Sequence, residues 1–101
     1  MNIRYKKTAL TDIQEIERYI SDTLHNKSAA KKLTTRIVQA ILLLEDNPWM
    51  GTPLNSQYDV ATDLRYLVVS GRLIFYRVLD DDYVEVIRVL DGRQDYMAIL
   101  F

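Results

Sequence analysis

Three short runs of β-branched and aromatic residues, separated by two brief polar breaks, dominate the last third of this chain. The runs cover residues 65–69, 72–79 and 83–90, and the breaks are Ser70-Gly71 and Asp80-Asp81-Asp82. Runs of this kind, joined by tight turns, are typical of consecutive antiparallel strands. The sequence therefore predicts a three-stranded antiparallel meander in this part of the chain.

The first half of the chain predicts a strand followed by two helices. Ile3 and Tyr5 alternate with basic residues, which favours a short strand. Apolar residues then recur every three or four positions, as on the core-facing side of a helix: Leu10, Ile13, Ile16, Ile20 and Leu24. Thr8 or Thr11 is expected to cap this helix. A second helix is predicted from Ser28 to Asn47-Pro48, because the residue before a proline avoids the helical region.

A helical hairpin and a meander together predict a two-layer α+β fold: a short N-terminal strand, the helical hairpin, then the three-stranded antiparallel sheet. We expect the helices to cover one face of the sheet and the other face to remain open for contact. Residues 49–63 are expected to form a loop, with Trp49 and Met50 covering the end of the core. No linker divides the sequence, so residues 1–101 are predicted to form one domain.

The composition excludes several kinds of chemistry. The 101 residues include one histidine and no cysteine, so neither a zinc cluster nor a cysteine nucleophile can be built. We expect no cofactor and no metal, and we interpret Asp80-Asp81-Asp82 as a solvated turn. No apolar run approaches the roughly 20 residues of a membrane span, so a cytoplasmic protein without membrane contact is expected. The net charge of −1 argues against strong unaided binding to nucleic acid.

Arginine is the remaining candidate for function. From Leu54 onward the chain has five arginines and no lysine, and several of the arginines lie within the predicted strands. Arginine forms planar, bidentate contacts with phosphate or carboxylate and stacks on rings. Each strand arginine has a simpler explanation as a cross-strand partner of an acidic residue such as Glu85. Arg93 and Tyr96 follow the last strand, and we expect them to form an exposed pair that presents a charge and a ring together.

The second helix has more apolar side chains than one sheet can cover. Val38, Leu42 and Leu43 flank the main apolar stripe of this helix. An exposed apolar patch marks a partner site. We therefore expect these three residues to bind another protein.

Taken together, these motifs resemble the RelE/ParE superfamily, the toxins of bacterial type II toxin–antitoxin modules, often described as plasmid stabilisation proteins. The similarity runs nearly end to end and rests on several motifs in order: residues 9–16 with Tyr19-Ile20, Leu44 with Asn47-Pro48, Met50-Gly51 and Pro53, Leu64-Arg65, and residues 74–78 and 86–96. The resemblance implies a strand, a helical hairpin and an antiparallel meander, in agreement with the pattern above.

The resemblance also implies two kinds of target. RelE-like members cleave ribosome-bound mRNA without a metal, and the strand positions of their basic catalytic groups correspond to Leu64, Tyr66 and Leu73. Only Arg93 keeps a matching cation, and the tyrosine position near the C-terminus of those ribonucleases falls near Ile99 rather than Tyr96. Many relatives have a histidine where Asp91 stands. ParE-like members instead poison DNA gyrase and lack this catalytic set, so the chain is closer to ParE.

Three functions stay open at this point. The first is a non-enzymatic inhibitor of DNA gyrase, neutralised by a cognate antitoxin with which it forms an oligomeric complex. The second is a ribosome-dependent mRNA interferase, whose catalytic residues would be Arg65, Arg77, Arg93 and Tyr96. The third is a degenerate toxin that acts only as an antitoxin-binding co-repressor. In the first case, the same four residues are predicted to bind the target, and Val38, Leu42 and Leu43 to bind the antitoxin.

Overall fold

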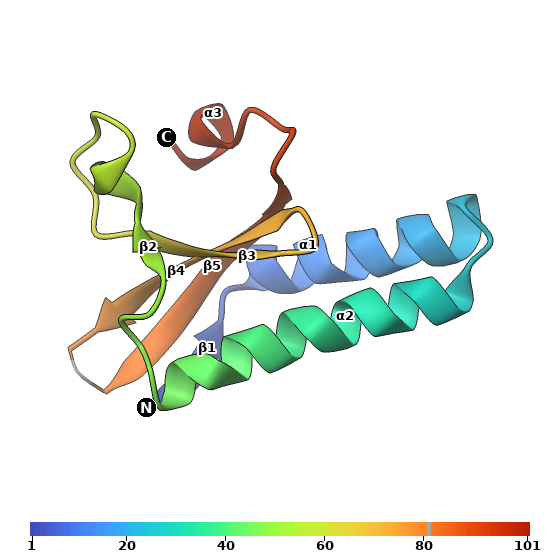
Figure 1. Cartoon of the computed structure of the whole chain (residues 1–101), viewed down its shortest axis with the longest axis horizontal. Coiled ribbons are helices and arrows are strands. Elements are labelled where there is room, and N and C mark those ends of the chain that lie inside the picture. Colours follow the sequence, from blue (N-terminus) through green and yellow to red (C-terminus); the bar gives the residue numbers. More distant parts are fainter. Residues whose placement is uncertain (81) are drawn as a thin grey trace.

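A five-stranded sheet forms the centre of the molecule (Figure 1). The structure is a computed structural model, and it describes residues 1–80 and 82–101. Asp81, the middle residue of the predicted acidic turn, lies outside the described residues. The strands are ordered β1-β5-β4-β3-β2 across the sheet. Their bounds are β1 Asn2–Tyr5, β2 Thr52–Pro53, β3 Arg65–Val69, β4 Arg72–Leu79 and β5 Tyr83–Asp91.

The predicted meander is confirmed as β3, β4 and β5, which pair antiparallel in sequence order. The N-terminal strand β1 pairs parallel with β5, so that Ile3 lies opposite Val84. At the other edge, the two residues of β2 pair with Tyr66 and Arg65. The sheet is therefore mixed, and it is wider by two strands than the meander, while the predicted α+β class is correct.

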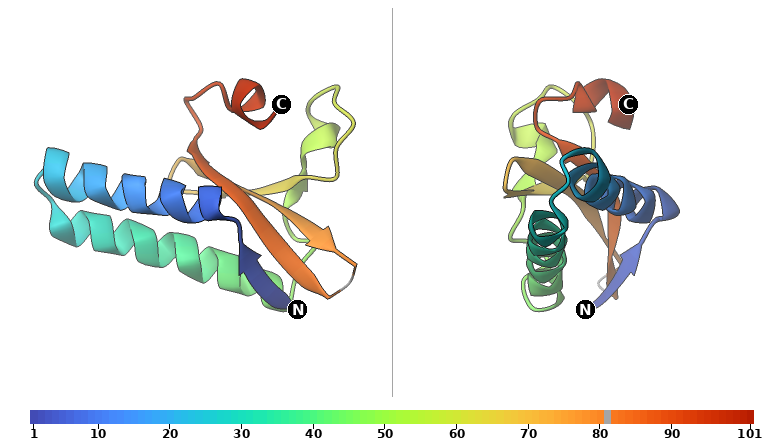
Figure 2. Two further views of the ribbon diagram at one scale, coloured as in Figure 1. Left: turned by 180° about the vertical axis from the view of Figure 1, so that it is seen from behind. Right: turned by 90° about the vertical axis from the view of Figure 1, so that its right-hand side faces the viewer.

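Two helices lie side by side on one face of the sheet and extend past the strands (Figure 2). Helix α1 (Lys7–Arg18) continues directly into a π-helical segment, η1 (Tyr19–Thr23), and helix α2 (Lys27–Leu42) into a 3₁₀ turn, η2 (Leu43–Glu45). The threonine cap predicted for the first helix is wrong, because α1 begins at Lys7 and the Thr8 hydroxyl donates to the Ile87 carbonyl. Helix α2 is capped by Asn26, whose side chain accepts from the Ala29 N–H.

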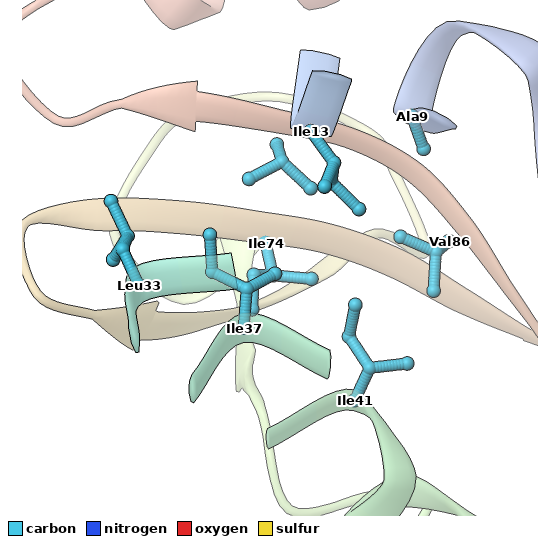
Figure 3. Close-up of a cluster of buried hydrophobic side chains, with 8 residues drawn as sticks. Ala9, Ile13, Leu33, Ile37, Ile41, Ile74 and Val86 are labelled. Atoms are coloured by element: carbon cyan, nitrogen blue, oxygen red, sulfur yellow. The ribbon is translucent and has the colours of Figure 1, made fainter. Parts of the chain in front are cut away.

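The main core lies between this hairpin and the sheet (Figure 3). It is built from small and branched side chains of α1, α2, β4 and β5: Ala9, Ile13, Leu33, Ile37, Ile41, Ile74, Val86 and Val89. Leu10 and Leu24, predicted to face the core, are exposed instead. Ile13, Ile16 and Ile20 face the core as predicted, and Ala9, four residues before Ile13, takes the inward position in place of Leu10.

The second face of the sheet is covered, which corrects the expectation of an open face. Helix α3 (Tyr96–Leu100) and the segment after β2, with the 3₁₀ turn η3 (Leu54–Ser56), pack there (Figure 1). Leu54 and Phe75 are completely buried in this second cluster. The physical reason is that β4 carries apolar residues in both alternating sets, so both of its faces have to be removed from water.

A β-bulge in β5 reverses the alternation of its side chains. Phe75 lies opposite Arg88, but the next residue, Tyr76, lies opposite Val86, so that Ile87 is the extra residue. Val86 and Leu90, placed on one face by simple alternation, therefore lie on opposite faces, and Val86 packs in the main core. Leu90 packs in the second cluster, and Arg88 reaches towards α1.

Arg88 forms an ion pair with Asp12 of α1. Asp12 is the one buried charged residue among the described residues. The Arg88 Nε and Nη2 atoms donate to the two Asp12 carboxylate oxygens at 2.7 Å and 2.9 Å. The Asp12 carboxylate also accepts from the Val89 N–H at 2.9 Å. These three bonds fix α1 on β5 at the bulge.

The segment before β2 is held by a buried tyrosine. The Tyr76 hydroxyl donates to the Pro48 carbonyl at 2.9 Å and accepts from the Gly51 N–H at 2.8 Å. A Cβ atom at position 51 would lie 2.5 Å from this hydroxyl, so only glycine fits. Trp49 and Met50, expected to cover the core, are about half exposed, and Leu54 is buried in their place.

Replacing Asp12 by alanine is expected to lower the free energy of unfolding by about 3 kcal/mol, because the Arg88 guanidinium and the Val89 N–H then lose their partner in a largely buried site. Urea unfolding of the purified variant measures this. The matched control is Glu15→Ala, an exposed acidic residue of the same helix, for which a change below about 0.5 kcal/mol is expected.

The double variant Asp12→Leu/Arg88→Met separates the charge effect from the backbone bond. It should recover most of the unfolding free energy that Asp12→Ala loses, since no charge is left uncompensated. A loss of about 1 kcal/mol should remain, because the Val89 N–H still lacks its acceptor. An Asp12→Ala variant as stable as the wild-type protein would show that the ion pair does not hold the helix.

Candidate functional site

The chain after β5, which contains Arg93 and Tyr96, is a short loop that leads into α3. The Gly92 N–H donates to the Gly71 carbonyl at 2.9 Å, so this loop is tied to the turn between β3 and β4. Asp95 caps α3 by accepting from the Ala98 N–H. The positions of Arg93 and Tyr96 are thus set by the sheet, although both residues lie beyond its last strand.

Arg93 is the most exposed of the four predicted site residues, and its side chain is 91% exposed. It nevertheless has a fixed partner, because its Nε and Nη2 atoms donate to the two Asp91 carboxylate oxygens at 3.2 Å and 3.0 Å. The Arg93 backbone N–H also donates to Asp91, at 2.9 Å. These bonds lower the pKa of Asp91 to about 2, so the pair is fully charged at neutral pH.

Tyr96 does not share an exposed surface with Arg93, contrary to the expected pair. Its ring packs edge-on against Tyr58, with centroids 6.1 Å apart, and at 5.5 Å against Phe75. Its hydroxyl forms a hydrogen bond with the Tyr58 hydroxyl. This bond, together with burial, raises the pKa of Tyr96 to about 12. Tyr96 therefore anchors α3 on the second face of the sheet.

Arg65 and Arg77 are each engaged by their surroundings. The Arg65 guanidinium donates to the Trp49 and Gly51 carbonyls at 3.1 Å and 2.9 Å and lies 5.0 Å from the centre of the Trp49 ring. Arg77 Nε lies 3.6 Å from the Asp63 carboxylate, which is an ion pair without a hydrogen bond. The four predicted arginine and tyrosine residues are thus dispersed over separate contacts and do not converge on one centre.

The positions that the sequence resemblance predicts to correspond to basic catalytic groups in RelE-like ribonucleases lie on the second face of the sheet. Leu64 and Leu73 are buried there, with exposed fractions of 4% and 7%. Tyr66 packs on the same cluster, and its hydroxyl donates to the Gln57 side chain. This region is an apolar core under α3 and the segment after β2.

An apolar surface extends from the end of α2 to the segment before β2. Leu42 and Leu43 are each about half exposed, as are Trp49 and Met50 further along the chain. Val38, the third residue predicted to bind a partner, is partly buried on α2. Below we call Leu42, Leu43, Trp49 and Met50 the apolar surface.

The edge of the sheet at β3 is only partly covered. β2 pairs with the first two residues of β3, and Leu67, Val68 and Val69 lie beyond this short pairing. Val68 is the most exposed large hydrophobic side chain among the described residues. Uncovered strand edges of this kind accept an additional strand from a partner.

Sequence reasoning missed the acidic partners of the arginines. Asp12 lies between Ala9 and Ile13 on the buried side of α1, and a carboxylate in an apolar stripe signals a paired charge. Asp91 gave no comparable signal.

Among residues 1–80 and 82–101, no group of three histidine or acidic side chains lies close enough to hold a metal ion. Within the same residues, no helix has the length and hydropathy of a membrane span.

Comparisons with known proteins give one family and one similar fold. The family described as "ParE toxin of type II toxin-antitoxin system, parDE" matches residues 3–96. A solved structure, "Chromosomal ParDE TA system from P. aeruginosa", superimposes with a TM-score of 0.74, covers 90% of this chain and 95% of that chain, and is 20% identical in sequence. At that identity the likeness concerns the fold. No curated protein sequence matches the chain.

The Tyr58–Tyr96 contact predicts how stability depends on alkaline pH. Folding raises the pKa of Tyr96 from 10.0 to about 12, so its contribution to stability is complete below pH 10 and is lost as the pH rises through about 12. Tyrosinate absorbance, followed together with urea unfolding, measures both effects. Tyr58→Phe removes the hydrogen bond between the two hydroxyls, which is the main cause of the raised pKa, and should shift the pKa of Tyr96 back towards its ordinary value. A Tyr96 that titrates normally in the wild-type protein would mean that α3 is not docked.

Proposed function

The chain belongs to the ParE toxin family of type II toxin–antitoxin systems, and from this membership we propose that it arrests growth by acting on DNA gyrase until a cognate antitoxin neutralises it. It acts as a binding protein and not as an enzyme. Its target contact lies at the exposed Arg93, while Tyr96, Arg65 and Arg77 hold the surrounding segments in place.

One observation supports DNA gyrase rather than mRNA as the target. Metal-free RNA cleavage needs a base, an acid and cations around the phosphate. The positions that would supply the strand cations are Leu64 and Leu73, which are buried in an apolar cluster. A phosphate placed there would lose its hydration without gaining a charged partner, and this cost is large. These positions therefore favour the non-enzymatic function.

The antitoxin is proposed to bind the apolar surface together with the open edge of β3. Exposed leucines, a tryptophan and a methionine next to an uncovered strand edge suit a segment that folds on binding, part helix and part strand. Val38 lies on the same helix as Leu42 and widens this contact. The resulting complex is expected to be an oligomer of toxin and antitoxin.

Expression without antitoxin is expected to cause filamentation and DNA damage while cellular mRNA stays intact. Arg93→Ala should abolish growth arrest, because a desolvated arginine at an interface commonly contributes about 2 kcal/mol or more. Arg4→Ala, an exposed arginine of β1, is the matched control and should stay toxic. Growth curves, microscopy and primer extension on transcripts provide the measurements.

Each alternative function has its own outcome in this experiment. Cuts within codons on translating ribosomes would replace gyrase by mRNA as the target. Absence of growth arrest, with antitoxin binding retained, would leave only the co-repressor role.

The antitoxin site is tested with Leu42→Glu. A charge in the apolar surface is expected to weaken binding to the antitoxin encoded by the neighbouring reading frame by about 2 kcal/mol, since a carboxylate would have to be buried against an apolar segment. Leu10→Glu, at a comparably exposed leucine of α1, is the control and should bind normally. Isothermal titration calorimetry measures both. Equal affinities of the two variants would place the antitoxin elsewhere.

A further inference from the structure

A cleft of about 480 Å³ lies between α1, the beginning of η1 and the chain after β5. Three arginines from three different segments line it, namely Arg72 at the start of β4, Arg88 in β5 and Arg93 beyond β5. The lining also contains three acidic residues, Asp12, Glu15 and Asp91, together with Tyr19 and Gln94. The charges of the three arginines and three acids cancel in number, so their pairing decides what the cleft can bind.

Two of the three arginines have carboxylate partners of their own. Asp12 accepts two bonds from Arg88 and one from the Val89 N–H. Asp91 accepts three bonds from Arg93, one of them from its backbone N–H. Neither carboxylate therefore has much remaining capacity to accept from another arginine.

Arg72 is the third arginine, and it lacks such a partner. It lies directly opposite Asp91 in the pairing of β4 with β5, yet the Asp91 oxygens are taken by Arg93. Its Nε atom is buried and has no hydrogen-bond partner among the described residues. A buried donor on a charged group without an acceptor is destabilising, and it indicates a missing oxygen ligand.

We infer that this cleft binds a carboxylate side chain of a protein partner, with the Arg72 guanidinium as its anchor. A carboxylate matches the fork of an arginine and would satisfy Nε together with a second nitrogen of the same group. Gln94 uses its side-chain oxygen to accept from the Asp91 N–H, which leaves its amide nitrogen as a further donor at the cleft. Tyr19 also lines the cleft.

The acidic lining selects against a polyanion. A nucleic-acid backbone carries a charge at every phosphate and would bring further negative charges close to Glu15, Asp12 and Asp91. A single aspartate or glutamate on an otherwise neutral or basic segment meets Arg72 without this repulsion. Occupation of the cleft follows from the arrangement of its charges and does not depend on what the toxin acts on.

The test uses the intact protein and two probes, a blocked glutamate dipeptide and inorganic phosphate. NMR titration follows the Nε–H resonance of Arg72, which should shift with the dipeptide, and the same titration gives the dissociation constant. Arg72→Gln should weaken binding about tenfold or more, because hydrogen bonds to a charged group are lost. Arg72→Lys, which keeps the charge but not the fork, should also bind more weakly.

Arg4→Gln is the matched control for the change in net charge. Arg4 lies in β1, where its guanidinium carbon is 3.9 Å from the centre of the Tyr83 ring. Arg4 does not line the cleft. This variant should bind the dipeptide like the wild-type protein. Thermal denaturation without probe shows whether each variant is folded.

Three results would overturn the inference. The first is no shift of the Arg72 resonance with either probe, and the second is equal weakening by Arg72→Gln and Arg4→Gln. The third is tighter binding of phosphate than of the dipeptide, which would make a phosphate group the ligand of the cleft. Growth arrest is measured separately. Failure of the cleft to bind the dipeptide is therefore distinguished from failure of the protein to act on gyrase.

Discussion

The contact between Asp12 and Arg88 connects the two layers of this protein at the place where the last strand changes its alternation. Arg88 directly follows the bulge residue Ile87, and the carboxylate of Asp12 accepts hydrogen bonds from both the Arg88 guanidinium and the next backbone N–H. Without the bulge, Leu90 would face the hairpin instead of the second cluster. The ion pair therefore fixes α1 on β5, and the bulge next to it sets the face on which Leu90 packs.

The first strand, the two long helices and the meander follow from local patterns and were predictable, whereas β2 and α3 were not predicted. The runs that became β3, β4 and β5 differ from their predicted bounds by a single residue, Asp91. The bulge, the parallel pairing of β1 with β5 and the cover on the second face depend on contacts between distant segments, which no local period encodes. The open second face was a wrong prediction, although β4 carries apolar residues in both of its alternating sets, a pattern typical of a strand buried on two faces.

The five arginines show why composition alone does not locate a site. Arg65 holds the segment before β2, Arg77 pairs with Asp63, Arg88 with Asp12 and Arg93 with Asp91, while Arg72 lacks a carboxylate partner of its own among the described residues. The sequence singled out the set because of its residue type. Only the positions of their partners, the aspartates and the backbone carbonyls, show which arginines are already engaged within the protein.

The pairing of the first strand with the last has a consequence for the order in which the protein can fold during synthesis. Among the described residues, the strand partner of residues 2–5 of β1 is residues 83–86, so β1 stays unpaired until residue 86 has been translated. The hairpin of α1 and α2 is built from near neighbours and can form long before this, since local contacts form faster than distant ones. The bulge and the Asp12–Arg88 pair likewise form only after residue 88 has been translated. A nascent chain therefore carries its helices early, and it acquires the loop with Arg93 only after all five strands have been synthesised.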